Sequence, residues 1–124
     1  MNHSNSHKFN EVFQLLNEIK DKGNLDGIIF AYRDGEPISE NIGDEFNCRK
    51  FASMCATVLE SAIGIGETIG NQKFKKVIAE LEEKTILIFE CDNTTFFILI
   101  INRESNISYI ISKLEEIIPK IINV

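Results

Sequence analysis

Six consecutive apolar residues constrain the fold of this chain more than any other segment. The run Phe96-Phe97-Ile98-Leu99-Ile100-Ile101 is rich in β-branched and aromatic residues, so it predicts a strand over Thr95–Ile101. A strand with one face in water alternates apolar and polar side chains, and this one does not. Both of its faces must therefore be covered, as in a central strand of a sheet with helices on each side.

Two further strands are predicted before it, at Lys73–Leu81 and Thr85–Cys91. The gaps are short and contain the turn-forming pairs Glu82-Glu83 and Asp92-Asn93. Three strands joined in this way predict an antiparallel meander.

A hairpin is predicted earlier in the chain. The strand-forming run Gly27–Tyr32 is followed by Asp34-Gly35, a pair that favours a type I′ turn, in which both central residues have positive φ. The returning strand is expected over Glu36–Ile42. Its Pro37 cannot donate a ladder hydrogen bond, so this strand is placed at the edge or the beginning of a sheet.

Two helices are predicted near the ends of the chain. The first has an apolar face and stops at Gly23, and the last is capped by Ser105 or Asn106, with Pro119 expected to kink or terminate it. The apolar face of the first helix consists of Phe9, Val12, Phe13, Leu16 and Ile19. The apolar face of the last helix consists of Ile107, Ile110, Ile111, Leu114, Ile117, Ile118 and Ile121.

A long helix is predicted between the hairpin and the meander, from the N-cap Asn47 to about Gly70. Its polar residues form only a narrow stripe, so its apolar surface is wider than one sheet can cover. This helix needs two burial partners. The order of elements is α-β-β-α-β-β-β-α.

Length and charge narrow the possible functions. The chain has 124 residues and a mass of 14.1 kDa, which is typical of one domain, with residues 1–8 expected to form a flexible tail before a domain over 9–124. Its formal net charge is −6 and its pI is about 4.9, which argues against nucleic acid and anionic membranes as partners. No signal peptide or membrane span is recognised, and three unpaired cysteines suit a cytoplasmic protein.

Catalytic and metal-binding patterns are weak. His3 and His7 could bind a metal if their segment were helical, but both lie in the expected tail. The glycines of the segment 64–70 do not follow a strand, as a dinucleotide-binding loop requires. The acids of the hairpin and the following loop are interpreted as solvated side chains, and they are Asp34, Glu36, Glu40, Asp44 and Glu45. No catalytic residue, cofactor or metal is assigned.

The order of elements and three segments together resemble the Roadblock/LC7 family. The segments are the hairpin Tyr32–Ile38, the start of the long helix at Phe51–Ala56, and the junction Asn102–Ile107 after the last strand. The resemblance spans about Phe9 to Val124. It implies an α+β sandwich, in which a five-stranded antiparallel sheet has the long helix on one face and the two terminal helices on the other.

The resemblance also implies a function. Family members dimerise through their third strands and long helices, have no known catalytic residues, and act as platforms or regulators of small Ras-like GTPases or as light chains of motor complexes. As a stand-alone domain of prokaryotic type, this chain is expected to be a homodimer that binds a small GTPase. A twin helix would supply the second burial partner that the long helix lacks.

The dimer seam is predicted from the long helix and the third strand. The helix residues are Phe51, Cys55, Val58, Ala62 and Ile65, although spacing alone does not separate those facing the sheet from those facing a twin. Antiparallel pairing of the strand around Ile78 would set Lys76 opposite Glu80 and Val77 opposite Ala79 of the second copy.

Two alternatives stay open. The same dimer could be a structural subunit of a larger scaffold or motor-type complex, without a nucleotide-linked role. A small-molecule sensor or enzyme of the profilin or PAS type would need a pocket with convergent polar groups, and the predicted strands offer almost only aliphatic and Phe side chains.

Overall fold

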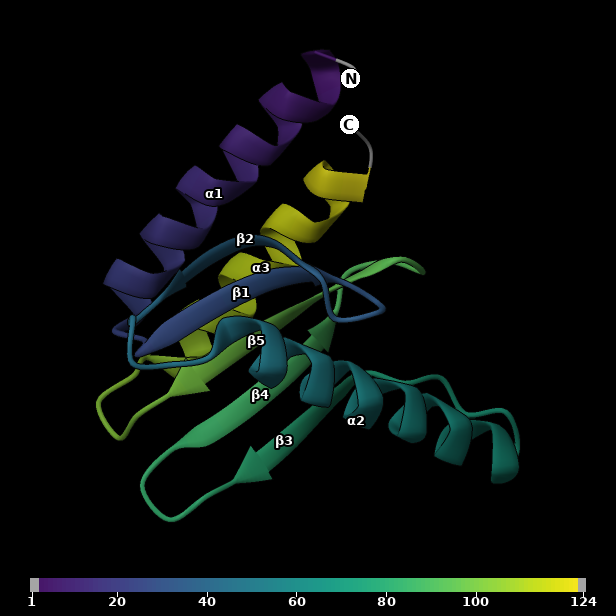
Figure 1. Ribbon diagram of the computed structural model, residues 1–124. Coiled ribbons are helices and arrows are strands. Elements are labelled where there is room, and N and C mark those ends of the chain that lie inside the picture. The colour runs from purple at the N-terminus through teal and green to yellow at the C-terminus, as the bar shows by residue number, and fades with distance from the viewer. Residues whose placement is uncertain (1–2, 123–124) are drawn as a thin grey trace.

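The chain forms one antiparallel sheet of five strands between two helical layers (Figure 1). The computed structural model describes residues 3–122, with side chains described over residues 10–121. The elements are α1 (His3–Gly23), β1 (Gly27–Tyr32), β2 (Pro37–Ile42), α2 (Cys48–Thr68), β3 (Lys76–Glu80), β4 (Thr85–Glu90), β5 (Thr95–Ile101) and α3 (Ile107–Ile122). The predicted fold class and order of elements are confirmed.

The sheet has the strand order β2-β1-β5-β4-β3, with β5 in the centre. All seven residues of β5 are buried, as their unbroken apolar character predicts. Phe97 and Leu99 belong to the core under α1 and α3, whereas Phe96, Ile98 and Ile100 belong to the core under α2. The strand therefore joins two separate cores through one layer of backbone.

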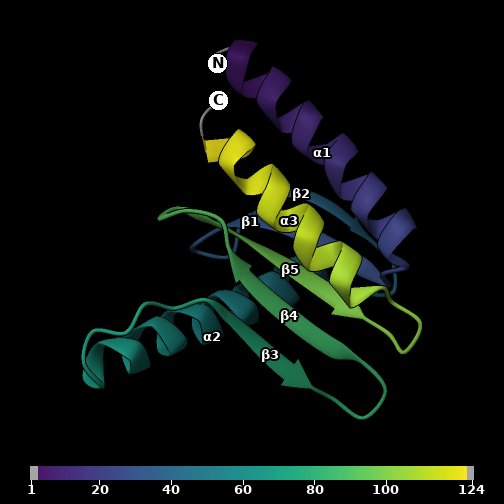
Figure 2. The same ribbon diagram turned by 180° about the vertical axis from the view of Figure 1, so that it is seen from behind.

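The terminal helices α1 and α3 cover one face of the sheet, over the part that contains β2, β1 and β5 (Figure 2). Helix α1 begins at His3, six residues before Phe9, where the domain was expected to begin. Whether residues 3–8 are flexible stays a prediction. Residues 1–2 and the side chains of His3 and His7 lie outside the described part of the chain.

Helix α3 begins after Asn106, whose Oδ1 accepts a hydrogen bond from the N–H of Tyr109 at 3.0 Å. This confirms one of the two predicted caps. The expectation that Pro119 terminates the helix is wrong, because α3 continues to Ile122. Pro119 lies on the exposed side of the helix, where water can satisfy the carbonyl left without its usual donor.

The turn between β1 and β2 differs from the predicted type I′ turn. Gly35 has a φ of 95°, but Asp34 is not among the residues with positive φ. The N–H of Gly35 donates to Tyr32 O at 2.8 Å, and that of Tyr32 to Glu36 O at 2.9 Å. The register of the two strands shifts between Phe30 and Ala31, which leaves Ile38 of β2 without an opposite residue. The turn is a three-residue loop closed by a glycine bulge. Edge placement of β2, inferred from Pro37, is confirmed.

The third strand is shorter than predicted. It starts at Lys76 and not at Lys73, because the chain after α2 first turns back over the end of that helix. The N–H of Gln72 donates to Gly66 O at 2.9 Å, and Gly70 has a φ of 100°. Residues 71–75 therefore form a connection and not a ladder. Among the described helices, none is long and apolar enough to cross a membrane.

Candidate functional site

Helix α2 carries an apolar stripe that the sheet does not cover. Met54, Val58, Ile65 and Ile69 are 61%, 43%, 62% and 65% exposed. Spacings of four and seven residues place Met54, Val58 and Ile65 on one side of the helix. Ile69, the C-cap residue, follows Ile65 by four residues at the end of the same row. A row of large exposed apolar side chains on one side of a helix is typical of a surface for association.

The structure shows which of the predicted α2 residues face the sheet and which face outward, a distinction that the sequence could not make. Among the predicted seam residues, Val58 and Ile65 are exposed, and Ala62 is half-buried. Cys55 is only 6% exposed and lies in the core between α2 and the sheet, and Phe51 is half-buried against the same core. These last two side chains have little surface left for a partner. We therefore assign Cys55 to the monomer core.

Met54 and Ile69 belong to the exposed stripe, although the predicted seam did not include them. Both lie on the broad apolar side recognised in the sequence, and their spacing from Val58 and Ile65 was the signal that could have selected them. The buried residues of α2 end at Leu59, and they are Ala52, Cys55, Ala56 and Leu59. The second half of the helix thus has the larger uncovered surface.

Strand β3 lies at one edge of the sheet, and no described element pairs with its outer side. Val77 and Ala79 are half-buried and pack toward α2. Lys76, Ile78 and Glu80 are exposed on the other face, with Ile78 55% exposed. An edge strand with free N–H and C=O groups can pair with another strand.

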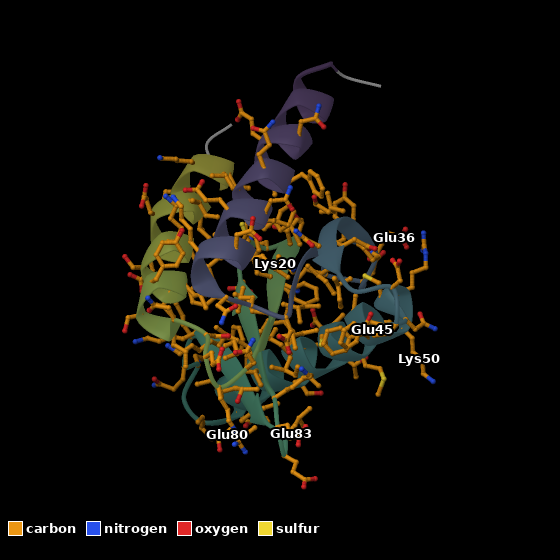
Figure 3. The ribbon with its side chains drawn as sticks, turned by 90° about the vertical axis from the view of Figure 1, so that its left-hand side faces the viewer. Lys20, Glu36, Glu45, Lys50, Glu80 and Glu83 are labelled. Carbon is orange, nitrogen blue, oxygen red and sulfur yellow. The ribbon has the colours of Figure 1, made fainter. Side chains whose placement is uncertain are left out.

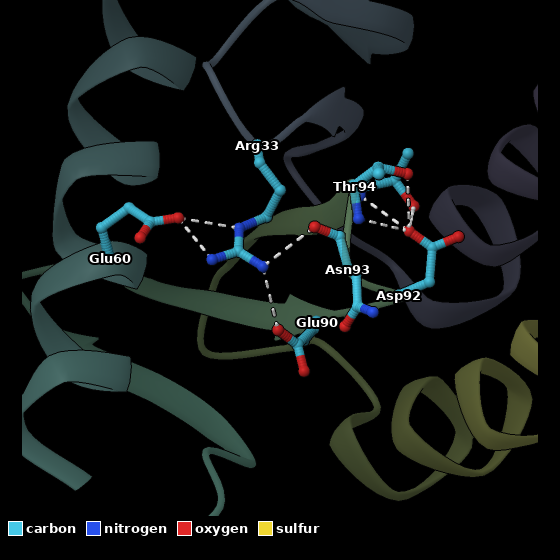
Figure 4. Close-up of polar contacts among 7 residues, drawn as sticks. Arg33, Glu60, Glu90, Asp92, Asn93 and Thr94 are labelled. Carbon is cyan, nitrogen blue, oxygen red and sulfur yellow. Dashed lines mark hydrogen bonds and ion pairs between the residues drawn. The ribbon is translucent and has the colours of Figure 1, made fainter. Parts of the chain in front are cut away.

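Arg33 attaches α2 to one end of the sheet (Figure 4). Its Nε donates to Glu60 of α2 at 3.0 Å, and its Nη1 donates to Glu90 of β4 at 3.4 Å and to Asn93 O at 3.2 Å. A further bond joins Nη2 to Glu60, and the backbone N–H donates to Thr94 O at 2.8 Å. One guanidinium, 22% exposed, therefore links three segments that are distant in the sequence.

The turn beside Arg33 is ordered by a carboxylate. Asp92 Oδ1 accepts from the N–H groups of Thr94 and Thr95, both at 2.8 Å, and from their hydroxyls at 3.0 and 2.8 Å. Burial raises the pKa of Asp92, but these four hydrogen bonds outweigh burial and hold the pKa below its usual value. These bonds fix the β4–β5 turn and with it the position of the Asn93 carbonyl that Arg33 binds.

The five acids of the hairpin and the following loop are exposed, and two of them have side-chain partners. Glu36 pairs with Arg49 at 2.7 Å, and Glu40 accepts from the thiol of Cys48 at 2.9 Å. Burial, with Glu40, raises the pKa of Cys48 to about 12, and burial alone raises that of Cys55 to about 11. Both thiols are protonated at neutral pH and are poor nucleophiles. Within the described residues, no three metal-binding side chains come together.

The fold and this surface define a small α+β protein suited to associating with other proteins. The chain belongs to the Roadblock/LC7 domain family, whose sequence model matches residues 11–102. The resemblance seen in the sequence is thereby confirmed. A search of curated proteins finds no match.

Solved structures share this fold at low sequence identity. MglB of Myxococcus xanthus matches with a TM-score of 0.82 and 12% identity, over 90% of this chain and 85% of that chain. The gliding protein MglB of Thermus thermophilus gives 0.80 and 11%, over 92% and 90%. A Roadblock/LC7 domain from Streptomyces avermitilis gives 0.77 and 13%, over 89% and 97%. At these identities the likeness is one of fold.

Proposed function

We propose that this chain forms a homodimer through α2 and β3, and that the dimer is a non-enzymatic platform that binds and modulates a small Ras-like GTPase. The observation that carries the dimer is the stripe Met54, Val58, Ile65 and Ile69, which the monomer leaves in water. Burying such side chains stabilises an assembly by roughly 25 cal/mol per Å² of apolar surface removed from water.

The position of α2 favours a second copy as the partner of this stripe. The C-terminal half of the helix projects past β3 and away from the sheet in both views (Figures 1 and 2). A second sheet joined at the free edge of β3 would continue beneath this projecting half. The twin α2 would then cover the exposed stripe, as a two-fold arrangement requires.

The alternation of β3 supports the predicted register around Ile78. Because Lys76, Ile78 and Glu80 share one face, each Lys76 would meet a Glu80 beside two facing Ile78 side chains. Val77 and Ala79 would meet on the α2 side. On the helix, the proposed seam keeps Val58, Ala62 and Ile65 and adds Met54 and Ile69.

Binding of a GTPase rests on membership of the family, in which this role is common. The net charge of −6 favours a partner with a basic surface. A structural subunit without a nucleotide-linked role is the alternative. Pull-down from the native cell extract with GDP or with a non-hydrolysable GTP analogue separates the two, since only a regulator recovers a GTPase in a nucleotide-dependent way.

The dimer is tested by sedimentation of the wild type and of Val58→Asp. The wild type is expected to sediment as a dimer, and Val58→Asp as a monomer or as insoluble protein, because a carboxylate would be buried in the seam. Thr57→Asp is the matched control, since Thr57 is exposed on the polar flank of the same helix. A monomeric wild type, or a stable Val58→Asp dimer, would contradict the proposal.

A further inference from the structure

A second exposed apolar surface lies at the end of the sheet opposite Arg33. Leu81, just after β3, is 61% exposed, and Ile107, the first residue of α3, is 49% exposed. Both line one groove between the β3–β4 turn and the start of α3, with Thr85 and Ile101 also in its lining. The groove lies on the α3 side of the sheet. The stripe on α2 lies on the other side, so the two are different surfaces.

The walls of this groove are fixed by a polar network. Lys84 in the β3–β4 turn forms an ion pair with Asp26, which also accepts from Asn102 Nδ2 at 2.8 Å. The N–H of Asn102 donates to Ser105 Oγ at 3.0 Å, and Ser105 Oγ donates to Asn24 O at 2.7 Å. Three loops are thereby joined to one another. A groove built in this way loses little conformational entropy when it binds.

The charge around the groove is acidic. Glu80, Glu82 and Glu83 all line it and are exposed. Lys84 already faces Asp26, which leaves Arg103 as the other base in the lining. Figure 3 shows Glu80 and Glu83 projecting at the same end of the molecule, away from Glu45. The potential here attracts cations, so the groove favours a basic partner.

We propose that this groove binds a basic segment of a partner protein, with one or two large apolar side chains seated against Leu81 and Ile107 and lysine or arginine side chains beside Glu82 and Glu83. Leu81 and Ile107 provide the apolar surface that binding removes from water. The glutamates favour a positively charged partner over a negatively charged one. Glu80 lines both this groove and the proposed dimer seam. The test changes only Leu81, Glu82, Glu83 and Ile107, which lie outside that seam, so it does not depend on the dimer.

The test uses a fluorescent peptide of alternating lysine and leucine, titrated with the full chain and followed by anisotropy. The wild type is expected to bind it, and a peptide with glutamate in place of lysine is expected not to bind. Glu82→Lys with Glu83→Lys should weaken binding by about tenfold or more, and so should Leu81→Ser with Ile107→Ser. All four side chains are exposed, so these variants are expected to fold.

Two controls separate the groove from general attraction to an acidic protein. Asp44→Lys with Glu45→Lys makes the same change of charge at a distant loop, and Phe13→Ser removes an exposed apolar side chain from α1. Both are expected to bind the peptide nearly as the wild type does. The proposal is overturned if the wild type does not bind, if the control charge reversal weakens binding equally, or if the Leu81 and Ile107 changes have no effect. Sedimentation of the same variants reports the dimer independently.

Discussion

Single side chains at the ends of the strands hold together segments that the sheet alone would leave loose. Arg33 is the clearest case, since its guanidinium reaches α2, β4 and the β4–β5 turn. Arg33→Ala would leave Glu90 half-buried without this partner, so we expect the free energy of unfolding to fall by about 1–2 kcal/mol. Urea denaturation followed by circular dichroism measures this change.

The matched control is Arg49→Ala, which removes a different arginine–glutamate pair. Arg49 and Glu36 are 74% and 48% exposed, so water screens their attraction and the expected loss is less than about 0.5 kcal/mol. Equal losses for the two variants would show that Arg33 acts as an ordinary surface ion pair and does not attach α2 to the sheet.

At the scale of one element, two glycines of α2 are predicted to respond in opposite ways to alanine. Apart from its chain neighbours and the backbone of its own helix, a Cβ at Gly64 would meet no atom within 4 Å. Gly64→Ala should therefore gain helix propensity and raise the free energy of unfolding by about 0.5–1 kcal/mol. A Cβ at Gly66 would clash with the backbone oxygen of Gln72, so Gly66→Ala should destabilise the protein. Thermal unfolding of both variants measures the difference.

The contrast between these glycines depends on the chain that turns back at residues 69–72. Because both substitutions add the same methyl group to the same helix, their difference reports this packing and not helix propensity. Stabilisation by both variants would mean that Gln72 does not lie against Gly66 in solution. Destabilisation by both would indicate that the twin helix of the proposed dimer packs closely against Gly64.

Elements were predictable where their own residues decide their structure. The unbroken apolar run of β5 and the cap of α2, where Asn47 Oδ1 accepts from the N–H of Lys50 at 3.1 Å, follow from local rules. The start of β3 did not, because residues 71–75 are set by contact with the end of α2. Likewise, the turn at Gly35 fits against Ser53 of α2, and a hairpin pattern contains no information about that neighbour.

The candidate site was predictable only in part, for the same reason. Periodicity identified the broad apolar side of α2, which contains both Cys55 and Val58. It did not reveal that Cys55 points into the core while Val58 stays in water, because the angle at which a helix meets a sheet depends on all of its contacts. The groove beside Ile107 likewise depends on three loops that meet only in the folded chain.

At the scale of the whole molecule, the two apolar surfaces have different chemistry. The stripe on α2 consists of large apolar residues beside a free strand edge, which suits a second copy. The groove at Leu81 and Ile107 is lined by glutamates, which suits a basic segment. A dimer built through α2 and β3 would therefore leave two copies of the groove open on the opposite face of one continuous sheet, one for each bound partner.

The register of that continuous sheet can be tested by disulfide trapping. In the proposed pairing, Val77 of one copy lies directly opposite Ala79 of the other, at a Cα separation of about 4.5–5.5 Å that a disulfide can bridge. Oxidation of co-expressed Val77→Cys and Ala79→Cys chains, with Cys48 replaced by Ser because it is only half-buried, should give a mixed cross-linked dimer on non-reducing gels. Cys55 and Cys91 are buried and can stay in place.

The Val77→Cys chain alone distinguishes this register from its neighbours. Two Val77 positions would be offset by two residues along the seam, about 7–8 Å apart on the diagonal, which is too far for a disulfide without movement of the backbone. Efficient cross-linking of Val77→Cys with itself, together with failure of the mixed pair, would place Val77 opposite Val77. Lys76 would then no longer face Glu80, so the charge pairing that supports the seam would be lost as well.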